Sequence, residues 1–408
     1  MLNILINAYA VSPNWGSEPG MGWNWVINIA KYCNVHVITE GEWKDEILAA
    51  VAKLPQKDNL HFYFNPVPDK VRKMCWNQGD WRFYYHYARW QRKTLDIARK
   101  IVSENHIDVM HQLNMIGFRE PGYLYRIKDI PLVWGPIGGM GNIPTSFLKG
   151  AGWKQNIFNR VKNFVSDAQI ILHPRVRKMM KRSFPIAAVA ATQQKVMRYY
   201  GKDIPLINET GTEIVDCPPR EANHSEILKI LWVGKFDFRK RLDIALKAIA
   251  MANNRQIELK ICGTGSETQV SMYRTMAKDL GIDNQIKWLG TVQHDKISDM
   301  MAKSDLLFFT SISEATSTVV VEAITAGLPI LSFNACGFGP LVSEFAGVTI
   351  PVETPSKAVE NFAREINILH ACPERLREIS KDELANAHRL SWEYKGKMMN
   401  SCYNELMR

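Results

Sequence analysis

Two glutamates are spaced so that one strand-to-helix turn would present both of them to a ligand. Glu314 and Glu322 lie eight residues apart, and a helix is expected to begin near Thr316 to Thr318, with Ser or Thr as its cap. The free N–H groups at such a helix start suit an anionic diphosphate, and the carboxylates can accept hydrogen bonds from sugar or ribose hydroxyls. A plainer interpretation also stands, in which Glu314 supports the helix dipole and Glu322 is solvated.

Two lysines upstream of this turn follow the end of a predicted strand. Lys235 comes directly after the strand expected over residues 227–233, and Lys240 lies five residues further on, before the next helix. Two cations in this loop could neutralise the charge of a leaving diphosphate, although basic loop residues are usually just solvated. Gly263 and Gly265 follow the next strand, where a backbone without side chains permits a ligand to approach closely.

The elements that must position these residues alternate between strand and helix in both halves of the chain. In the first half, strands are expected at residues 2–9, 35–39, 60–65, 107–112, 132–134 and 187–191. In the second half, they are expected at residues 227–233, 257–262, 286–289, 306–310 and 329–333. This alternation predicts two doubly wound α/β units with parallel sheets, in which ligands bind at the carboxyl ends of the strands.

Length and composition exclude several classes of protein. The chain has 408 residues, of which 46% are apolar and 23% charged, which is typical of globular proteins and too long for one core. No apolar run is long enough to span a membrane, and the first residues are expected to form a strand rather than a signal peptide. Seven scattered cysteines without C-x-x-C spacing predict reduced thiols in a cytosolic protein, with no structural zinc.

The net charge of +10 is carried by the first half of the chain. Residues 1–208 contain 28 basic and 15 acidic side chains, whereas residues 209–408 contain 23 and 26. A basic half predicts an anionic partner, which could be nucleic acid, a phosphate-bearing ligand or a membrane surface. Aromatic and basic residues mix over residues 76–92, but no nucleic-acid-binding fold signature accompanies them.

Residues 149–184 combine a helical apolar stripe with many cations. The apolar residues recur every three or four positions, at Trp153, Ile157, Val161, Phe164, Ala168 and Ile171. A basic cluster follows, consisting of Arg175, Arg177, Lys178, Lys181 and Arg182. One interpretation is an amphipathic helix that lies on anionic lipid. The other is an ordinary helix that faces the core and has a solvated basic face.

Together and in this order, these segments resemble glycosyltransferase family 4, whose members are retaining enzymes of the GT-B fold. The resemblance covers nearly the whole chain and is strongest over residues 230–345. The E-x7-E signature of the family falls on Glu314 and Glu322, and its phosphate-binding pair falls on Lys235 and Lys240. In the first half, the segments at residues 16–23 and 134–139 resemble a bacterial polysaccharide-assembly branch of the family.

The resemblance implies a GT-B architecture of two Rossmann-like domains that face each other across a cleft. Residues 1–205 would form the N-terminal acceptor-binding domain and residues 206–225 a linker. Residues 226–385 would bind the nucleotide sugar, and residues 386–408 would form a helix that crosses back to the N-terminal domain. The family also often has a His-x-His after an Asp, of which only His111 is present here. His111 is either a residue that lines the cleft or a core histidine.

The implied reaction moves a hexosyl or N-acetylhexosaminyl group from a nucleotide-diphosphate sugar to a saccharide or lipid-linked saccharide, with retention, in capsule or O-antigen synthesis. The nucleotide sugar is a co-substrate, and neither a metal nor another cofactor is expected, because side chains supply the cations. The implied catalytic residues are Lys235, Lys240, Glu314 and His111. The implied donor-binding residues are Gly16, Gly263, Gly265, Ala315, Thr316, Ser317, Thr318 and Glu322.

The chain also departs from the family pattern. Lys235 stands where the family often has Arg, so bidentate phosphate contacts are lost there. Residues 315–317 lack the glycines common at this place, so no donor sugar is inferred. The alternatives are an epimerase or phosphorylase of the same fold, a non-catalytic sugar-nucleotide-binding protein and a nucleic-acid-binding protein. The favoured partners exclude nucleic acid, and the expected location is the cytoplasm, on the inner face of the cell membrane.

Overall fold

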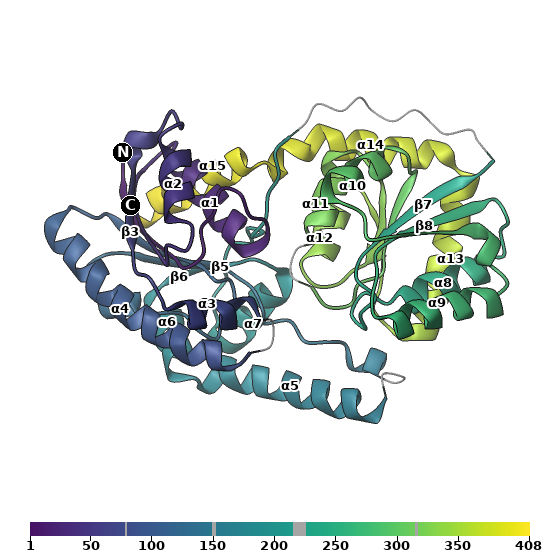
Figure 1. The fold of residues 1–408 in the computed structure, drawn as a ribbon, viewed down its shortest axis with the longest axis horizontal. Helices are drawn as coiled ribbons and strands as arrows, with labels where there is room; N and C mark the ends of the chain where they lie inside the picture. The colour runs from purple at the N-terminus through teal and green to yellow at the C-terminus, as the bar shows by residue number, and fades with distance from the viewer. Residues whose placement is uncertain (78–79, 149–151, 215–225, 315–316) are drawn as a thin grey trace. The chain divides into compact units, whose positions relative to one another are not determined.

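The chain forms two compact units in the computed structural model, which describes residues 1–77, 80–148, 152–214, 226–314 and 317–408 (Figure 1). Unit 1 consists of Met1–Met140, Phe164–Gly211 and Trp392–Arg408. Unit 2 consists of Gly141–Asn163 and Thr212–Ser391. Each unit contains a six-stranded sheet in which all the pairings are parallel. The predicted fold class, two doubly wound Rossmann-like α/β domains, is confirmed.

The sheet of unit 1 has the strand order β3-β2-β1-β4-β5-β6. Its strands are β1 (Asn3–Ala8), β2 (Asn34–Thr39), β3 (Leu60–Phe64), β4 (Val109–Asn114), β5 (Leu132–Ile137) and β6 (Phe184–Ala187). Successive side chains of a strand point to opposite faces, and both faces of this sheet are covered. Ile4 and Ile6 share a core with residues of α1 (Ser17–Ile29) and α15 (Trp392–Leu406). Leu5 instead packs with residues of α4 (Arg82–Glu104) and α6 (Pro174–Arg182).

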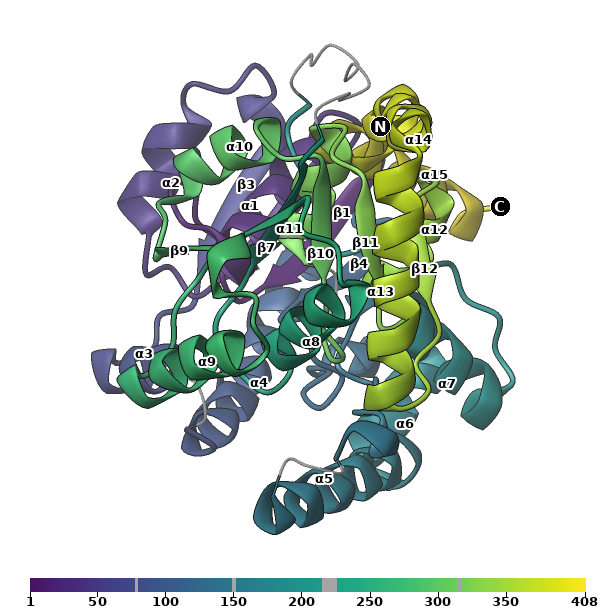
Figure 2. The ribbon, with the colours of Figure 1, turned by 90° about the vertical axis from the view of Figure 1, so that its right-hand side faces the viewer.

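The sheet of unit 2 has the order β12-β11-β10-β7-β8-β9. As in unit 1, the first and fourth strands of the unit are adjacent, and the later strands add outwards on each side. Its strands are β7 (Leu228–Val233), β8 (Ile257–Cys262), β9 (Ile286–Gly290), β10 (Leu306–Phe309), β11 (Ile330–Phe333) and β12 (Val348–Ile350). Figure 2 shows α8 (Leu242–Ala252) between α9 (Glu267–Asp279) and α13 (Pro355–Ala371). The remaining helices are α10 (His294–Ala302), α11 (Thr318–Thr325), α12 (Phe338–Glu344) and α14 (Pro373–Asn386).

Two predicted elements of unit 1 differ in the structure. The strand predicted at residues 187–191 lies at Phe184–Ala187, because the alanine-rich segment that follows begins α7 (Ala190–Tyr200). The basic segment predicted as one amphipathic stretch is two helices, α5 (Trp153–Leu172) and α6. Pro174 is the first residue of α6, and the preceding His173 is extended, as expected before a proline.

The unit boundaries also differ from the predicted domain boundaries. Residues 206–211 were expected in the linker but belong to unit 1, where the Ile207 N–H donates to the Ala187 carbonyl over 2.9 Å. Residues 141–163 belong to unit 2, so α5 contributes to both units. Trp392, at the start of α15, packs against Trp25 with ring centroids 5.9 Å apart. The remaining linker residues, 215–225, lie outside the described residues.

The two other helices of unit 1 are α2 (Lys44–Val51) and α3 (Asp69–Trp76). Within the described ranges, no helix is both long enough and apolar enough to cross a lipid bilayer.

Candidate active site

The carboxyl ends of β7 and β10 are joined by hydrogen bonds that converge on Thr310. The Thr310 hydroxyl accepts from Trp232 Nε1 over 3.0 Å and donates to the Lys240 carbonyl over 2.7 Å. The Ile312 N–H donates to the Arg239 carbonyl over 2.8 Å. β7 and β10 are adjacent although they are far apart in sequence, so this is the switch point where doubly wound sheets bind ligands.

Lys240 and Glu314 form an ion pair at this switch point. Lys240 Nζ contacts Glu314 Oε1, and the two side chains are 15% and 14% exposed. The Ser311 hydroxyl also donates to Glu314 Oε1 over 3.3 Å, and Lys240 Nζ lies 5.0 Å from the centre of the Phe309 ring. Because little water surrounds the pair, the electrostatic attraction between the two side chains is only weakly screened. Both side chains nevertheless keep some exposed surface that a ligand can contact.

The other predicted cation, Lys235, lies exposed just after β7. Its ammonium has no ion-pair partner among the residues that the structure describes. The turn between the two lysines is shaped by Asp237, whose Oδ1 accepts from the N–H groups of Arg239 over 2.8 Å and Lys240 over 3.2 Å. Asp237 and Thr310 were not predicted from the sequence to belong to the site. An aspartate that opens a turn is a recognisable signal, whereas the position of Thr310 depends on the sheet.

The helix predicted after Glu314 is α11, which begins at Thr318. Ser317 is its N-cap residue, but its side chain makes no capping hydrogen bond to the described part of the chain. The N–H groups of the first helical turn are therefore not taken by that side chain, which leaves the positive end of the helix suited to an anion. Glu322 lies partly exposed about one turn into α11. Ala315 and Thr316 lie outside the described residues.

Gly263 holds the loops after β7 and β8 together. A Cβ atom at this position would lie 1.8 Å from the Gly234 carbonyl oxygen. At Gly265, a Cβ atom would lie 2.9 Å from Cβ of Phe236. Both glycines are thus required by contacts within the protein, in addition to any approach of a ligand. At Gly16, which precedes α1, an added Cβ atom would meet no heavy atom within 4 Å.

Replacing Gly263 with alanine is expected to destabilise unit 2 by about 1–3 kcal/mol, the usual cost of overpacking, because the β7 or β8 loop must move. Urea denaturation of the full chain measures this loss. Gly16→Ala is the matched control and should leave the midpoint within experimental error. A Gly263→Ala midpoint equal to that of the wild type would show that these loops are not packed as described.

His111 is a core residue of unit 1 and does not line an open surface. Its side chain is 0% exposed. Nε2 lies 2.6 Å from the Gly135 carbonyl oxygen and so donates to it, which leaves Nδ1 to accept from the Tyr403 hydroxyl at 2.5 Å. Burial lowers the pKa of His111 to about 4. The catalytic assignment of His111 is therefore corrected, because both ring nitrogens are already bound inside the protein.

Glu18, to which sequence reasoning gave no role, lies in the first turn of α1 just after Gly16 and not in a loop. Its Oε1 accepts from the Ile116 N–H over 3.2 Å, while its Oε2 is buried without a hydrogen-bond partner in the described structure. Burial raises the pKa of Glu18 to about 7, a shift that the Ile116 N–H partly opposes.

The five basic residues predicted to form a membrane or acceptor surface fall into two groups. Arg175 pairs with Glu120 through both of its terminal nitrogens, and Arg182 donates to the carbonyls of residues 127, 128 and 130. These two side chains are held inside unit 1. The remaining three, Arg177, Lys178 and Lys181, are exposed on α6.

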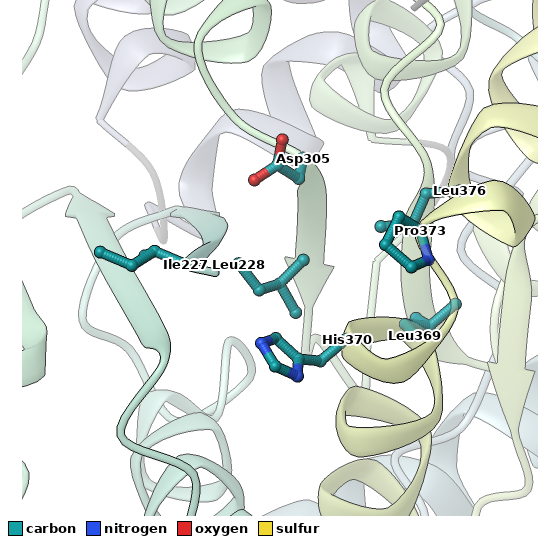
Figure 3. Close-up of a pocket in the computed structure, with 7 residues that line it drawn as sticks. All are labelled: Ile227, Leu228, Asp305, Leu369, His370, Pro373 and Leu376. Atoms are coloured by element: carbon teal, nitrogen blue, oxygen red, sulfur yellow. The ribbon is translucent and has the colours of Figure 1, made fainter. Parts of the chain in front are cut away.

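Two pockets of unit 2 are lined by residues other than Lys240 and Glu314. The first, of about 610 Å³, is lined by residues that include Phe147, Arg241 and Tyr273. Figure 3 shows the second, a small pocket beside Asp305 and His370. The second pocket lies at the amino-terminal ends of β7 and β10, the edge of the sheet that ligands do not use. No group of three or more His, Cys, Asp or Glu side chains within the described residues could hold a metal ion.

The two doubly wound parallel sheets, each wound in the same order, give the chain the two-domain architecture of the GT-B class. Residues 219–383 match the family model of group 1 glycosyl transferases. For residues 219–383, this match confirms the resemblance to glycosyl transferases that the motifs predicted. The matched segment contains all four of Lys235, Lys240, Glu314 and Glu322.

Known proteins resemble the chain in parts of its sequence and in its whole fold. A D-inositol 3-phosphate glycosyltransferase of Rhodococcus erythropolis is 27% identical over 172 residues, which is 40% of this chain and 38% of that protein. The lipopolysaccharide glucosyltransferase WaaG of Escherichia coli is 27% identical over 115 residues, which is 28% of this chain and 30% of that protein. The chain spans about half or less of the length of the curated relatives that it matches.

Among solved structures, Anabaena HepE in complex with UDP and glucose covers 99% of this chain and 100% of its own, at 16% identity and a TM-score of 0.57. A likeness of this degree shows the fold, and it confirms the predicted GT-B architecture.

Proposed function

We propose that the protein is a retaining glycosyltransferase that moves a hexosyl or N-acetylhexosaminyl group from a nucleotide-diphosphate sugar to a saccharide or lipid-linked saccharide, in the synthesis of a cell-surface polysaccharide such as a capsule or O-antigen. The observation that carries the proposal is the Lys240–Glu314 pair at the switch point of unit 2, in the loops that precede α8 and α11. The family match over residues 219–383 supports it.

In the proposed reaction, negative charge builds up on the diphosphate as the bond to the sugar breaks. Lys235, Lys240 and the N–H groups at the start of α11 stabilise that charge, because they are positioned before the reaction and need little reorganisation. Lys240 contacts the phosphates from its position beside Glu314, and Glu314 accepts hydrogen bonds from the sugar. Glu322 binds the ribose. The acceptor hydroxyl passes its proton to the departing phosphate oxygen on the same face of the sugar.

Incubation with a panel of nucleotide sugars, with UDP-glucose first, tests the proposed reaction and its alternatives. A glycosyltransferase releases nucleotide diphosphate faster when a lipid-linked saccharide is added, and NMR of the product shows the anomeric configuration of the donor. An epimerase yields an isomerised sugar without an external acceptor, a phosphorylase requires phosphate, and a binding protein turns over nothing. Binding of RNA in place of nucleotide sugar would favour the nucleic-acid alternative.

Turnover is expected to persist when divalent metal ions are removed. Under the proposal, lysine side chains and helix N–H groups supply the positive charge that a metal would otherwise provide. The measurement is the rate of nucleotide diphosphate release before and after dialysis against EDTA. Complete loss of activity that Mg²⁺ or Mn²⁺ restores would contradict this part of the mechanism.

We also propose that the protein acts in the cytoplasm, at the inner face of the cell membrane, by peripheral contact with anionic lipid. The part of α5 that belongs to unit 1 exposes large apolar side chains, of which Phe164 is 75% and Leu172 67% exposed. Exposed apolar residues next to cations are typical of helices that lie in the interface of a membrane. The exposed cations that follow in unit 1 are Arg177, Lys178 and Lys181 of α6, and α5 itself exposes Lys154, Arg160 and Lys162 in its unit 2 part.

The triple variant Arg177→Glu, Lys178→Glu and Lys181→Glu is expected to lose at least tenfold in affinity for anionic vesicles. Each cation near such a surface contributes about 1 kcal/mol, and salt screens the effect over a Debye length of about 8 Å. Vesicle co-sedimentation at low and high salt measures the loss. The control variant, Lys278→Glu, Lys296→Glu and Lys303→Glu, makes the same charge change on exposed residues of unit 2 and should bind normally. If the wild-type chain does not bind anionic vesicles at low salt, the proposed membrane contact is refuted.

A further inference from the structure

Three tryptophans from separate segments of unit 1 form a cluster at the surface. Trp15 lies in the loop after β1, Trp43 immediately precedes α2, and Trp76 ends α3. Their ring centroids are 5.6–6.2 Å apart. Trp15 and Trp76 are 56% and 45% exposed, and Trp43 is partly buried. We infer that this tryptophan cluster is a platform that binds a neutral saccharide, and that it forms part of the acceptor site.

The platform is built on an ion pair between the buried Glu40 and the partly buried Arg72. Glu40, at the end of β2, is 3% exposed and accepts from Arg72 Nη2 over 2.8 Å and from Arg72 Nε over 3.0 Å. The same carboxylate accepts from the Val67 N–H over 2.8 Å. A buried carboxylate requires such partners, and here they fix α3 to the end of β2. The pair thereby positions Trp76 against the other two indole rings.

The geometry of the three indole rings shows that they present a surface to a ligand and do not surround it. Aromatic cages for quaternary ammonium ions place the rings around a space large enough for the ion. Here, centroid separations of about 6 Å mean that the rings touch one another, and the planes of Trp15 and Trp76 are tilted by 35°. A ligand can therefore reach only their outer faces. Those faces offer apolar area beside polar edges, which suits the C–H face and the hydroxyls of a sugar ring.

The polar groups around the rings favour a neutral, hydroxylated ligand. Glu42 Oε2 accepts from Trp76 Nε1 over 3.1 Å, and Glu46 Oε2 accepts from Asn14 Nδ2 over 2.8 Å. Both glutamates are exposed, so they retain free lone pairs that can accept from hydroxyl groups. Their negative charge disfavours anionic lipid or nucleic acid at this surface. The nearby cation Lys44 is directed to Phe64, whose ring centre lies 5.3 Å from its ammonium.

The position of the cluster indicates its role. Trp15 and Trp43 lie in the loops that follow β1 and β2, at the carboxyl ends of the strands of unit 1, where ligands of such sheets bind. If unit 2 binds the nucleotide sugar, a saccharide bound at this edge of unit 1 is the acceptor. The assignment of the ligand as an acceptor therefore rests on the proposed function, whereas saccharide binding itself does not.

Saturation-transfer NMR with the full chain tests the platform directly. The probes are neutral di-, tri- and tetrasaccharides of gluco, galacto and manno configuration. At least one of them is expected to receive saturation through the C–H protons of one ring face. The double variant Trp15→Ala with Trp76→Ala should bind that saccharide at least tenfold more weakly. Trp153→Ala, which removes an exposed tryptophan of α5, is the matched control and should bind as the wild type does. Circular dichroism confirms that each variant is folded.

Two results would overturn the inference. One is that no saccharide of the panel binds at millimolar concentration, and the other is that the folded double variant binds as tightly as the wild type. Loss of vesicle binding in the double variant, without any saccharide binding, would likewise overturn it and assign the surface to the membrane. A wild-type chain that binds saccharide through the platform but turns over no nucleotide sugar would support the platform and refute the proposed function.

Discussion

Replacing Lys240 with alanine is expected to lower the turnover of nucleotide sugar roughly 30- to 1,000-fold. Such a loss corresponds to about 2–4 kcal/mol of transition-state stabilisation, the scale for one preorganised electrostatic group. The reason is the position of Lys240, which is mostly buried and held at the switch point by Glu314 and Phe309. The measurement is kcat for nucleotide diphosphate release at saturating donor.

The neighbouring Arg239 provides the matched control for this prediction. It lies in the same loop and carries the same charge, but its side chain is exposed and pairs with Asp237 over 2.9 Å. Exposed ion pairs of this kind contribute little free energy, so the turnover of Arg239→Ala should lie within about threefold of the wild-type value. Equal losses in the two variants would mean that the general charge of the loop matters, and near-normal turnover in Lys240→Ala would reject its role on the leaving group.

The free energy of unfolding of unit 1 is expected to fall as the pH decreases below about 6.5, because of His111. Burial lowers the pKa of this imidazole to about 4, whereas in the unfolded chain it is near 6.5. Between these two values, the unfolded state binds more protons, so protonation favours unfolding. One group shifted by this much removes about 3 kcal/mol of stability between pH 6.5 and pH 4.

The variant His111→Gln isolates this effect, because glutamine also offers one donor and one acceptor to Gly135 and Tyr403. Denaturant unfolding at a series of pH values should show that the stability difference between the wild type and this variant shrinks as the pH falls. Glu18 contributes with the opposite sign, since its raised pKa of about 7 gives stability at low pH that is lost as the pH rises to 7. A stability difference that is flat across the range would contradict the burial of His111.

The strands that were predicted correctly are those whose local sequence favours a strand and no other secondary structure. The strand at residues 257–262 alternates apolar and polar side chains, and β8 has those bounds. The strand expected at residues 187–191 was misplaced because its alanines also favour a helix. The three-residue β12 was not predicted, since so short a segment shows no periodicity.

Residues of the candidate site were predicted from the sequence, but the contacts between them were not. Lys240 and Glu314 are recognisable from their motifs, yet their contact depends on Thr310, which joins two strands that are 70 residues or more apart. The burial of His111 depends on Tyr403, which lies 292 residues away in sequence. The tryptophan cluster likewise depends on contacts between residues that are distant in sequence, since Trp15, Trp43 and Trp76 come from three separate segments. Contacts of this kind are set by the sheet order and not by local sequence.

Hydrogen–deuterium exchange with saturating UDP, GDP or ADP is the most direct test of the central claim, that the switch point of unit 2 binds the nucleotide diphosphate. At least one of the three nucleotides is expected to slow exchange in the segments around residues 234–241 and 317–322, because phosphate oxygens accept from N–H groups there. In Lys240→Ala, the same protection should require a higher nucleotide concentration. Protection that appears only outside these segments, or with none of the three nucleotides, would contradict the account.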